Sequence, residues 1–382
     1  MTRNPKIVIA PDSFKGTLSA NDVCAIWHGA FKEHFPEAEL TCVPMSDGGD
    51  GALEAILEAT DADVGGIRAE DPLGRPVQAF FALLNGHRTA FVETAAACGI
   101  VFLKREERNP MVASSFGAGQ LIADALEFRV EELIVSIGGS ATVDGGVGML
   151  QALGYRFLDA DGAEIGRGGG ELHRIATIDA TNANPAIGRT KFRIASDVTN
   201  PLLGADGAAT VFGPQKGATP EMVAELEAGL GHFADVCAKC GIASDCCHKG
   251  DGAAGGMGFA LRAFLNAETC SGAAVVAGLV GLEEHIKNAD LVITGEGRTD
   301  RQTLFGKLPA FVADVAAKHS VPTILCSGAV EDRKELQRRF HAVFDTVPSV
   351  SSLEDVLANA KENLADTAAS IVQLLKLRLG DS

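Results

Sequence analysis

The sequence predicts an α/β fold: a discontinuous, Rossmann-like domain with a parallel sheet, carrying a second, inserted α/β domain. Short apolar runs are repeatedly followed by a loop rich in glycine and acidic side chains and then by an amphipathic helix, the alternation of a doubly wound sheet. The 382 residues also exceed one ordinary core. We expect one domain from residues 1–65 and 285–382, an inserted domain from 66–284, where antiparallel signals appear, and an active site in the cleft between them.

The first apolar run, residues 6–10, predicts a strand, and Ser19 begins a capping box that predicts the start of the next helix. The loop between them carries Asp12, Ser13 and Lys15 at the carboxyl end of the strand. A lysine in this position can bind a phosphate as a point charge. A capped turn with one exposed lysine would give the same pattern.

The second strand, residues 39–43, repeats this order, because it runs into the loop MSDGGDG at 45–51 and then into a helix. Two strand–loop–helix units in succession indicate a βαβ arrangement. The candidate binding residues of this loop are Ser46, Asp47, Gly48 and Gly49.

The inserted segment begins with antiparallel strands at 77–84 and 89–93 around the turn pair Asn85-Gly86. A helix at 114–127 then leads to a strand at 133–137 and to a loop of small residues. Glycine-rich loops can cradle phosphate or substrate because nothing obstructs their N–H groups. The candidates in this loop are Gly138, Gly139, Ser140, Thr142 and Asp144.

The strand at residues 192–195 is followed by Asp197, Thr199 and Asn200. A carboxylate at a strand end beside a hydroxyl and an amide fits a metal ligand or a general base. The alternative is an Asx turn that closes on Pro201. A further lysine, Lys216, lies in a turn and receives no assigned role.

The stretch from Asp290 to Lys307 concentrates charge directly after a buried strand at 291–293. Bare backbone, carboxylates and an arginine at a strand end suit polyanion or metal–phosphate chemistry, although a solvated charge cluster would look similar. Further strands at 323–326 and 343–347 and a helix capped by Ser352 complete the chain. The candidates in this stretch are Gly295, Glu296, Gly297, Arg298, Asp300, Gln302 and Lys307.

Composition argues against several functions. Hydrophobic residues make up 46% and charged residues 22%, as in a globular protein, and the net charge of −17 argues against nucleic acid or an anionic membrane as partner. No signal peptide and no run long enough to span a bilayer is apparent, so we expect a cytoplasmic protein. A zinc site at Cys237, Cys240 and the nearby Cys246-Cys247-His248 is an alternative, but Cys237 falls on the apolar face of a helix.

Two nucleotide-binding signatures lack support. Residues 250–255 match GxGxxG but follow CCHK rather than a strand, and no GxxxxGK[ST] occurs. A nicotinamide-dependent hydroxy-acid dehydrogenase would need GxGxxG after the first strand, where this chain has APDSFKG. A non-catalytic binding protein for small hydroxy acids remains an alternative, although it would hardly need so many carboxylates at strand ends.

Six motifs together resemble the type I glycerate kinases, in that family's order: VIAPDSFKGTLSA at 8–20, MSDGGDG at 45–51, GGSATVDGG at 138–146, SDVTNPLLG at 196–204, FGPQKGA at 212–218 and TGEGRTDRQTLFGK at 294–307. The resemblance implies phosphorylation of D-glycerate by ATP with Mg²⁺, two α/β domains and, as in several type I members, a 2-phosphoglycerate product. The chain departs from the family at Val143, where asparagine is common.

Roles within this reaction follow from general chemistry. Asp197 and Glu296 are the candidates for holding Mg²⁺ or for orienting the attacking hydroxyl, and Asp197, Lys15 and Arg298 are the candidate catalytic residues. No histidine lies in these loops, which favours an aspartate base. Which loop binds ATP, which binds D-glycerate, and whether the chain forms a homo-oligomer stay open.

Overall fold

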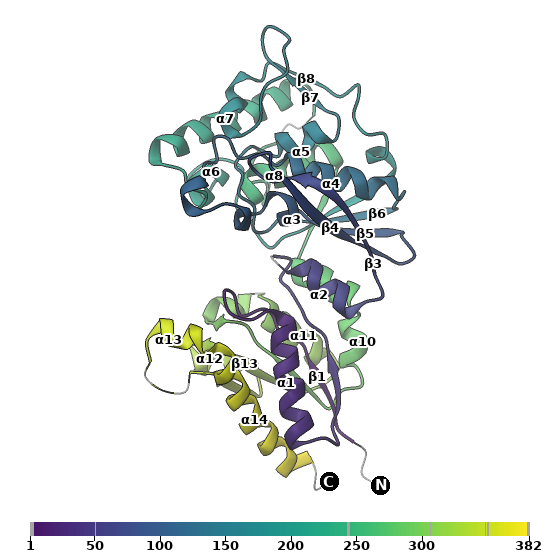
Figure 1. The fold of residues 1–382 in the computed structure, drawn as a ribbon, viewed down its shortest axis with the longest axis vertical. Coiled ribbons are helices and arrows are strands. Elements are labelled where there is room, and N and C mark those ends of the chain that lie inside the picture. Colours follow the sequence, from purple (N-terminus) through teal and green to yellow (C-terminus); the bar gives the residue numbers. More distant parts are fainter. Residues whose placement is uncertain are drawn as a thin grey trace. The chain divides into compact units, whose positions relative to one another are not determined.

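The computed structural model describes residues 4–49, 51–242, 245–305, 307–347, 349 and 351–379, without the side chains of Gln302, Phe305, Arg378 and Leu379. The chain forms two compact units. Unit 1 comprises Met1–Asp47, Glu54–Thr60 and Ala273–Ser382, and unit 2 comprises Gly48–Leu53 and Asp61–Gly272. The loop at 45–51 therefore divides between the units after Asp47 (Figure 1).

Unit 1 contains a five-stranded, wholly parallel sheet in the order β15-β13-β11-β1-β2. The chain places β2 on one side of β1 and all later strands on the other, so the strand order reverses between β1 and β11. This is a doubly wound fold, as the sequence predicted. The strands are β1 (Lys6–Ile9), β2 (Glu39–Cys42), β11 (Leu291–Thr294), β13 (Thr323–Ser327) and β15 (Ala342–Asp345), and a short pair joins β12 (Arg298–Thr299) to β14 (Ala329–Val330).

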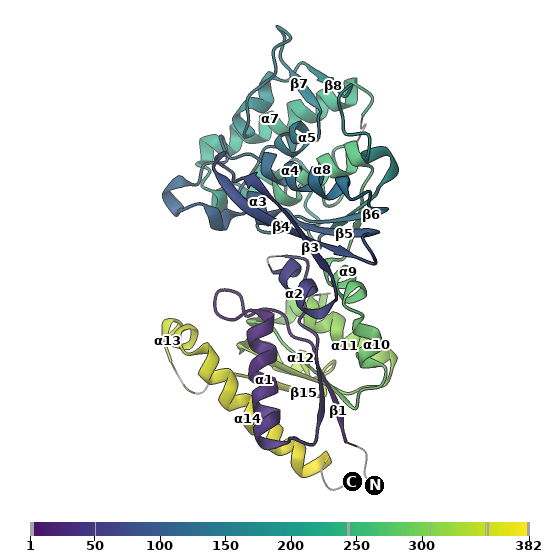
Figure 2. The same cartoon turned by 45° about the vertical axis from the view of Figure 1, so that its right-hand side comes forward.

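Helices cover both faces of this sheet. Ile7, Ile9 and Ile293 pack on one face against α1 and α14, which run side by side (Figure 1, Figure 2). Leu325 and Phe340 belong to the apolar cluster on the other face. The helices of this unit are α1 (Ala20–His34), α10 (Leu282–Ile286), η6 (Arg301–Phe305), α11 (Leu308–Lys318), α12 (Arg333–Leu336), α13 (Leu353–Ala358) and α14 (Ala360–Leu379), while α2 (Ala52–Ala59) and α9 (Gly272–Leu279) span the unit bounds.

Local capping signals in unit 1 are confirmed. The Ser19 side chain accepts from the backbone N–H of Asp22, and the Asp22 carboxylate accepts from the N–H of Ser19, which is a complete capping box. Ser352 caps α13 in the same way, by accepting from the N–H of Asp355. Lys307 is the N-cap residue of α11, with a proline in its first turn.

Unit 2 contains a six-stranded sheet in the order β10-β9-β6-β5-β4-β3. Strands β3, β4 and β5 are antiparallel, and β5, β6, β9 and β10 are parallel. Asn85 and Gly86 both adopt left-handed backbone angles between β4 and β5, as the turn pair predicted. The strands are β3 (Asp63–Glu70), β4 (Pro76–Leu84), β5 (Thr89–Glu93), β6 (Glu132–Ser136), β9 (Lys191–Ala195) and β10 (Glu268–Cys270), with a separate hairpin of β7 (Arg156–Leu158) and β8 (Thr177–Asp179).

The core of unit 2 is aromatic: the rings of Phe157, Phe233 and Phe259 meet edge to face, and Cys237 is buried among them on α7. Within the described residues, no helix has both the length and the apolar character that crossing a bilayer requires. The helices of this unit are α3 (Ala95–Cys98), η1 (Ile100–Phe102), η2 (Arg105–Glu107), α4 (Phe116–Glu127), α5 (Val147–Ala152), η3 (Gly169–Arg174), η4 (Ile187–Arg189), α6 (Ala208–Phe212), η5 (Pro214–Lys216), α7 (Pro220–Lys239) and α8 (Ala253–Leu265).

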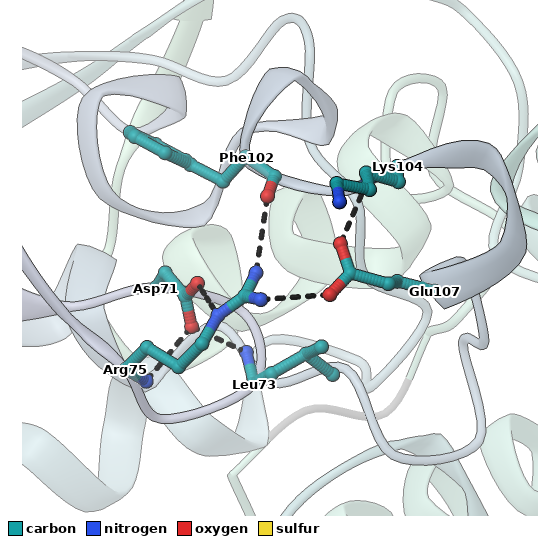
Figure 3. Close-up of polar contacts among 6 residues, drawn as sticks. All are labelled: Asp71, Leu73, Arg75, Phe102, Lys104 and Glu107. Carbon is teal, nitrogen blue, oxygen red and sulfur yellow. Dashed lines mark hydrogen bonds and ion pairs between the residues drawn. The ribbon is translucent and has the colours of Figure 1, made fainter.

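An arginine clamp closes the turn between β3 and β4 (Figure 3). Nε of Arg75 donates to the buried Asp71 carboxylate at 2.6 Å, and its other nitrogens donate to Glu107 at 2.8 Å and to the carbonyl of Phe102 at 3.0 Å. Asp71 also accepts from the N–H of Leu73. Each of the three guanidinium nitrogens of Arg75 has an acceptor, so we assign this cluster a structural role.

Candidate functional site

The carboxyl ends of β1 and β11 flank the point where the strand order of unit 1 reverses, and doubly wound sheets bind ligands at such points. Backbone hydrogen bonds continue past the strands, from the N–H of Asp12 to the carbonyl of Gly295 at 2.9 Å and from the N–H of Gly328 to the carbonyl of Glu296 at 3.0 Å. The exit loops therefore lie side by side. Together with α13 they enclose a cavity of about 390 Å³, lined by Asp12, Ser13, Phe14, Lys15, Thr17, Asp47, Glu296, Gly297, Arg298, Lys307, Leu308, Gly328, Ala329, Thr346, Leu353, Val356, Leu357 and Ala360.

Asp12 is the most perturbed acid of this cavity. Its side chain is buried and its Oδ1 accepts from the N–H of Ser13 at 2.7 Å. The pKa of Asp12 is raised to about 7, mainly by burial and to a smaller extent by the like charges of Asp47 and Glu296. The N–H of Ser13 and the charge of Lys15 oppose this shift. Three carboxylates thus face one cavity at the switch point, which favours the binding of a cation there.

Glu296 is held by hydroxyl groups. Its Oε1 accepts from Thr303 at 2.7 Å and from Thr299 at 3.1 Å, while its backbone N–H donates to Oγ of Ser327 at 3.2 Å. Burial raises the pKa of the Glu296 carboxyl, and the hydroxyls and Lys307 oppose this shift. Sequence reasoning did not single out Thr299, Thr303 or Ser327, although the two threonines lie in the same motif.

Three cations line the cavity beside these acids. Lys15 is exposed over 76% of its side chain and lies 3.5 Å from Asp47. Arg298 pairs with Glu331 at 2.7 Å, and Lys307 lies 3.7 Å from Asp300. Exposed pairs of this kind contribute little stability, so a polyanionic ligand can compete for the cations.

Part of the cavity lining is apolar. It is formed by Leu308 and by the α13 side chains Leu353, Val356 and Leu357, of which Leu353 is 73% exposed. A cavity whose lining is partly charged and partly apolar suits a ligand that has both characters.

Two of the predicted glycines have packing roles. A Cβ on Gly295 would lie 1.8 Å from the carbonyl oxygen of Cys326, and a Cβ on Gly297 would lie 3.2 Å from the backbone nitrogen of Lys15. Gly295 does not line the cavity. Its small size lets the ends of β11 and β13 approach, which gives Gly295 a packing role, and its sequence-based assignment to ligand binding stays a prediction.

Unit 2 has its own cavity, of about 240 Å³, at the carboxyl ends of β6 and β9. The predicted residues Gly138, Gly139 and Ser140 line it, and so do Ser196 and Val198 on either side of Asp197. The complete lining is Ile100, Ile137, Gly138, Gly139, Ser140, Ser196, Val198, Phe212, Gln215, Lys216, Ala253 and Ala254.

Lys216 is the residue that sequence reasoning missed. Only 3% of it is exposed, and its Nζ donates to Oγ of Ser140 at 2.9 Å and to the carbonyl of Thr142 at 2.8 Å. Burial lowers the pKa of Lys216 to about 8, and Cys98 and Asp144 oppose this shift only partly. The motif FGPQKGA placed this lysine in a turn, but nothing local indicates that the turn is buried.

Asp144 does not line this cavity, in contrast to its sequence-based assignment. It is buried, and it accepts from the N–H and hydroxyl of Ser115 at 2.8 Å each and from the N–H groups of Gly146 and Gly148. These four bonds join the starts of α4 and α5, so the carboxylate holds the loop rather than facing a ligand. Burial raises its pKa, and the four bonds lower it.

The other candidates of unit 2 have mixed environments. Asp197 and Thr199 are exposed, whereas Nδ2 of Asn200 donates to the carbonyl of Asp206 at 2.8 Å and so closes a turn. Thr142 is buried; its carbonyl accepts from Lys216, and its hydroxyl has no partner in the described structure. This places Asp197, but not Thr142, where a ligand could reach its side chain.

Gly48 and Gly49 belong to unit 2 and allow close backbone approach. A Cβ on Gly138 would lie 2.9 Å from Cα of Gly49, and the hydroxyl of Ser136 donates to the carbonyl of Gly48. In unit 1, Ser46 is buried and, like Asp300, is absent from the cavity lining. The side chain of Gln302, another candidate, lies outside the described residues.

Comparisons with known proteins agree over nearly the whole chain. The glycerate kinase family matches residues 7–376. The chain is 44% identical to "Glycerate 2-kinase" of Escherichia coli (strain K12), over 97% of this chain and 98% of that protein, and 42% identical to "Glycerate kinase" of Bacillus subtilis (strain 168), with the same coverage. A crystal structure assigned as glycerate kinase 2 from Salmonella typhimurium LT2 aligns with a TM-score of 0.86 and 43% identity, covering 98% of this chain and 99% of that one.

Proposed function

The chain belongs to the glycerate kinase family, and we propose that it transfers the γ-phosphoryl group of ATP to D-glycerate. The relatives named glycerate kinase extend over nearly the full length of the chain. The observation that carries the proposal within the molecule is the cavity of unit 1, where Asp12, Glu296 and Lys15 meet at the switch point of a doubly wound sheet. We further propose that the product is 2-phospho-D-glycerate, in line with the relative named "Glycerate 2-kinase".

We assign the nucleotide to the cavity of unit 1. The adenine ring would pack on the apolar part of the lining that includes Leu353 and Leu357, and the phosphates would lie toward Lys15, Arg298 and Lys307. Phosphoryl transfer depends mainly on positioning and on neutralising the charge of the equatorial oxygens, and these three cations supply such charge.

The residues of this cavity also fit Mg²⁺. The like charges of Asp47 and Glu296 raise the pKa of Asp12, a repulsion that a divalent cation would relieve. In the described residues, no group of three or more histidine, cysteine, aspartate or glutamate side chains could hold a metal alone. Mg²⁺ does not require one, because it usually binds through one or two carboxylates, water and substrate phosphates. Asp12 and Glu296 would hold the ion, which would neutralise phosphate charge when bound.

Asp197 is the residue that we propose to orient the attacking hydroxyl. It is exposed at the carboxyl end of β9, and its chain neighbours Ser196 and Val198 line the cavity of unit 2. The hydroxyl oxygen of D-glycerate would form the new bond to the γ-phosphorus as the bond to the leaving ADP oxygen breaks. The hydroxyl proton would pass to the Asp197 carboxylate.

The alternatives are weaker. The glycines at 250–255 lie at the kinked start of α8 rather than in the turn after a strand, so the dinucleotide signature lacks its structural context.

The nine cysteines are all free thiols, which supports the proposal of a reducing, cytoplasmic location.

Phosphorus NMR of the protein with ATP, MgCl₂ and D-glycerate tests the function directly. We expect ADP and the resonance of a 2-phosphate monoester. A 3-phosphate as main product would contradict the regiochemistry. D-glycerate binding without ATP turnover would indicate a non-catalytic binding protein instead.

A further inference from the structure

The cavity of unit 2 contains a buried cation, Lys216, whose hydrogen-bond acceptors are both neutral. In the described structure, Lys216 forms no ion pair: its two hydrogen-bond acceptors are a hydroxyl and a carbonyl, Oγ of Ser140 and the backbone oxygen of Thr142. An ammonium has three donors, so one N–H remains without an acceptor there. Burying a charge is unfavourable unless it is paired, so this environment favours the entry of an anion.

The shape of the cavity restricts that anion. Its volume of about 240 Å³ is below the roughly 300–1,000 Å³ of sites that take drug-sized ligands. Gly138 and Gly139 contribute backbone without side chains to the lining, and Ser196 and Gln215 add polar side chains. An acid of three or four carbons fits such a space, whereas a nucleotide would not be enclosed by it.

The number of cations that line a cavity indicates whether the cavity suits a carboxylate or a phosphate. Among the residues that the structure describes, Lys216 is the single lysine or arginine in the lining of this cavity, whereas the cavity of unit 1 has Lys15, Arg298 and Lys307. A monoanionic carboxylate is matched by one ammonium, and a dianionic or polyanionic phosphate is better matched by the three cations of unit 1.

We propose that the cavity of unit 2 is the acceptor site, in which Lys216 binds the carboxylate of the hydroxy acid. This deepens the proposed function and rests on it. A carboxylate bound at Lys216 limits acceptors to short acids that have a hydroxyl close to the carboxylate. That hydroxyl would lie on the side of the lining residues Ser196 and Val198, which flank Asp197. Burial lowers the pKa of Lys216 to about 8 and nearby Asp144 offsets this only partly, which agrees with an ammonium that forms no direct ion pair.

Calorimetric titration tests the proposal without turnover. D-glycerate, glycerol and inorganic phosphate are titrated separately into the wild type, into Lys216→Met and into the control Lys239→Met, whose lysine is exposed at the end of α7. ADP is titrated into the same proteins. We expect Lys216→Met to weaken D-glycerate binding by about 10²-fold, as for a lost charge-assisted hydrogen bond, with ADP affinity unchanged. The control should match the wild type, and when D-glycerate is titrated into wild type that already contains glycerol or inorganic phosphate, neither should compete with it.

Three outcomes would overturn the proposal: unchanged D-glycerate affinity in Lys216→Met, a loss of ADP affinity instead, or phosphate competing with D-glycerate. Should the variant not fold, hydrogen–deuterium exchange of the wild type answers the same question. D-glycerate should then protect peptides around 138–142 and 213–217, and protection confined to unit 1 would contradict the assignment. Binding at Lys216 without phosphorylation by the wild type would contradict the kinase function alone.

Discussion

The hydroxyl of Thr303 donates a hydrogen bond of 2.7 Å to Oε1 of Glu296, and Thr299 donates to the same oxygen at 3.1 Å. In the part of the chain that the structure describes, no hydrogen bond reaches Oε2. One oxygen is therefore fixed by protein donors, and the other is left for a ligand, which is the arrangement expected of a carboxylate whose own orientation is set by neighbouring hydroxyls.

Replacing Thr303 by valine keeps the shape of the side chain but removes the shorter of these bonds. We expect the Mg²⁺ concentration needed for half-maximal activity to rise roughly tenfold, since a hydrogen bond to a charged group contributes about 1.5–3 kcal/mol. The KM for D-glycerate should stay the same. Thr60→Val is the matched control, because that hydroxyl donates to the carbonyl of Ile56 in the helix α2 that ends just before it. Equal Mg²⁺ dependence in both variants would contradict a positioning role.

The raised pKa of Asp12 makes a prediction about stability. Its pKa is about 7 in the folded protein and 3.8 ordinarily, so folding takes up a proton between these values. The contribution of Asp12 to stability is therefore present below pH 4 and is lost as the pH rises through 7. Without Mg²⁺, Asp12→Asn should melt above the wild type at pH 8, by about 2–4 °C for each kcal/mol relieved.

At pH 4 the two melting temperatures should converge, because the wild-type carboxyl is then protonated as well. A difference that is the same at pH 4 and pH 8 would contradict the shifted pKa. The same variant should lose phosphoryl transfer, since the amide cannot replace the proposed Mg²⁺ ligand.

Lys15→Ala and Asp197→Asn should each lower kcat by about 10² or more while the fold stays intact, because removing one preorganised charge or base from a reaction centre has effects of this size. Steady-state kinetics measures kcat, and circular dichroism checks that the fold is intact. Lys32→Ala, an exposed lysine in the last turn of α1, is the control for Lys15. Normal turnover in Lys15→Ala would favour the alternative of a capped turn with an exposed lysine, and normal turnover in Asp197→Asn would favour the alternative of an Asx turn.

Gly295→Ala should destabilise the protein, because the new Cβ would lie 1.8 Å from the carbonyl oxygen of Cys326. Overpacking of this kind costs about 1–3 kcal/mol or more. In Gly29→Ala, on α1, the new methyl group meets nothing within 4 Å and should stabilise by roughly 0.5–1 kcal/mol through helix propensity. Chemical denaturation compares the two. A neutral Gly295→Ala would show that this strand end can shift.

Lys216 gives a pH dependence of opposite sign. Its pKa is about 8 in the folded protein and 10.5 ordinarily, so folding releases a proton between these values. The wild type should gain stability as the pH rises from 8 to 10.5, because the buried charge is lost. Lys216→Met has no such group, so its stability relative to the wild type should fall across this range. A constant difference would indicate that solvent reaches the ammonium.

Local patterns were enough to predict much of the fold. Short apolar runs predicted the five strands of the unit 1 sheet, and β4, β5, β6 and β9 of unit 2, to within about two residues, but they did not predict β3 or β10. Ser19 and Ser352 predicted two helix starts correctly, since a cap is decided by residues three apart. The exit loops of β1 and β11 were also predicted to be sites, because parallel strands bring their carboxyl ends to one edge. The helix caps depend on contacts within one short segment, and the position of the exit loops follows from a general rule of sheet topology.

What the sequence by itself determined is therefore the α/β alternation, the position of the charged loops and, through six motifs, the family. Only the tertiary structure decided that Asp144 holds two helix starts and that Lys216 is buried beside Ser140. Asp144 meets Ser115 across 29 residues of sequence, and Lys216 meets Ser140 across 76. Burial and hydrogen-bond partners at such separations depend on how distant segments pack, and a residue's own neighbours in the sequence do not encode them.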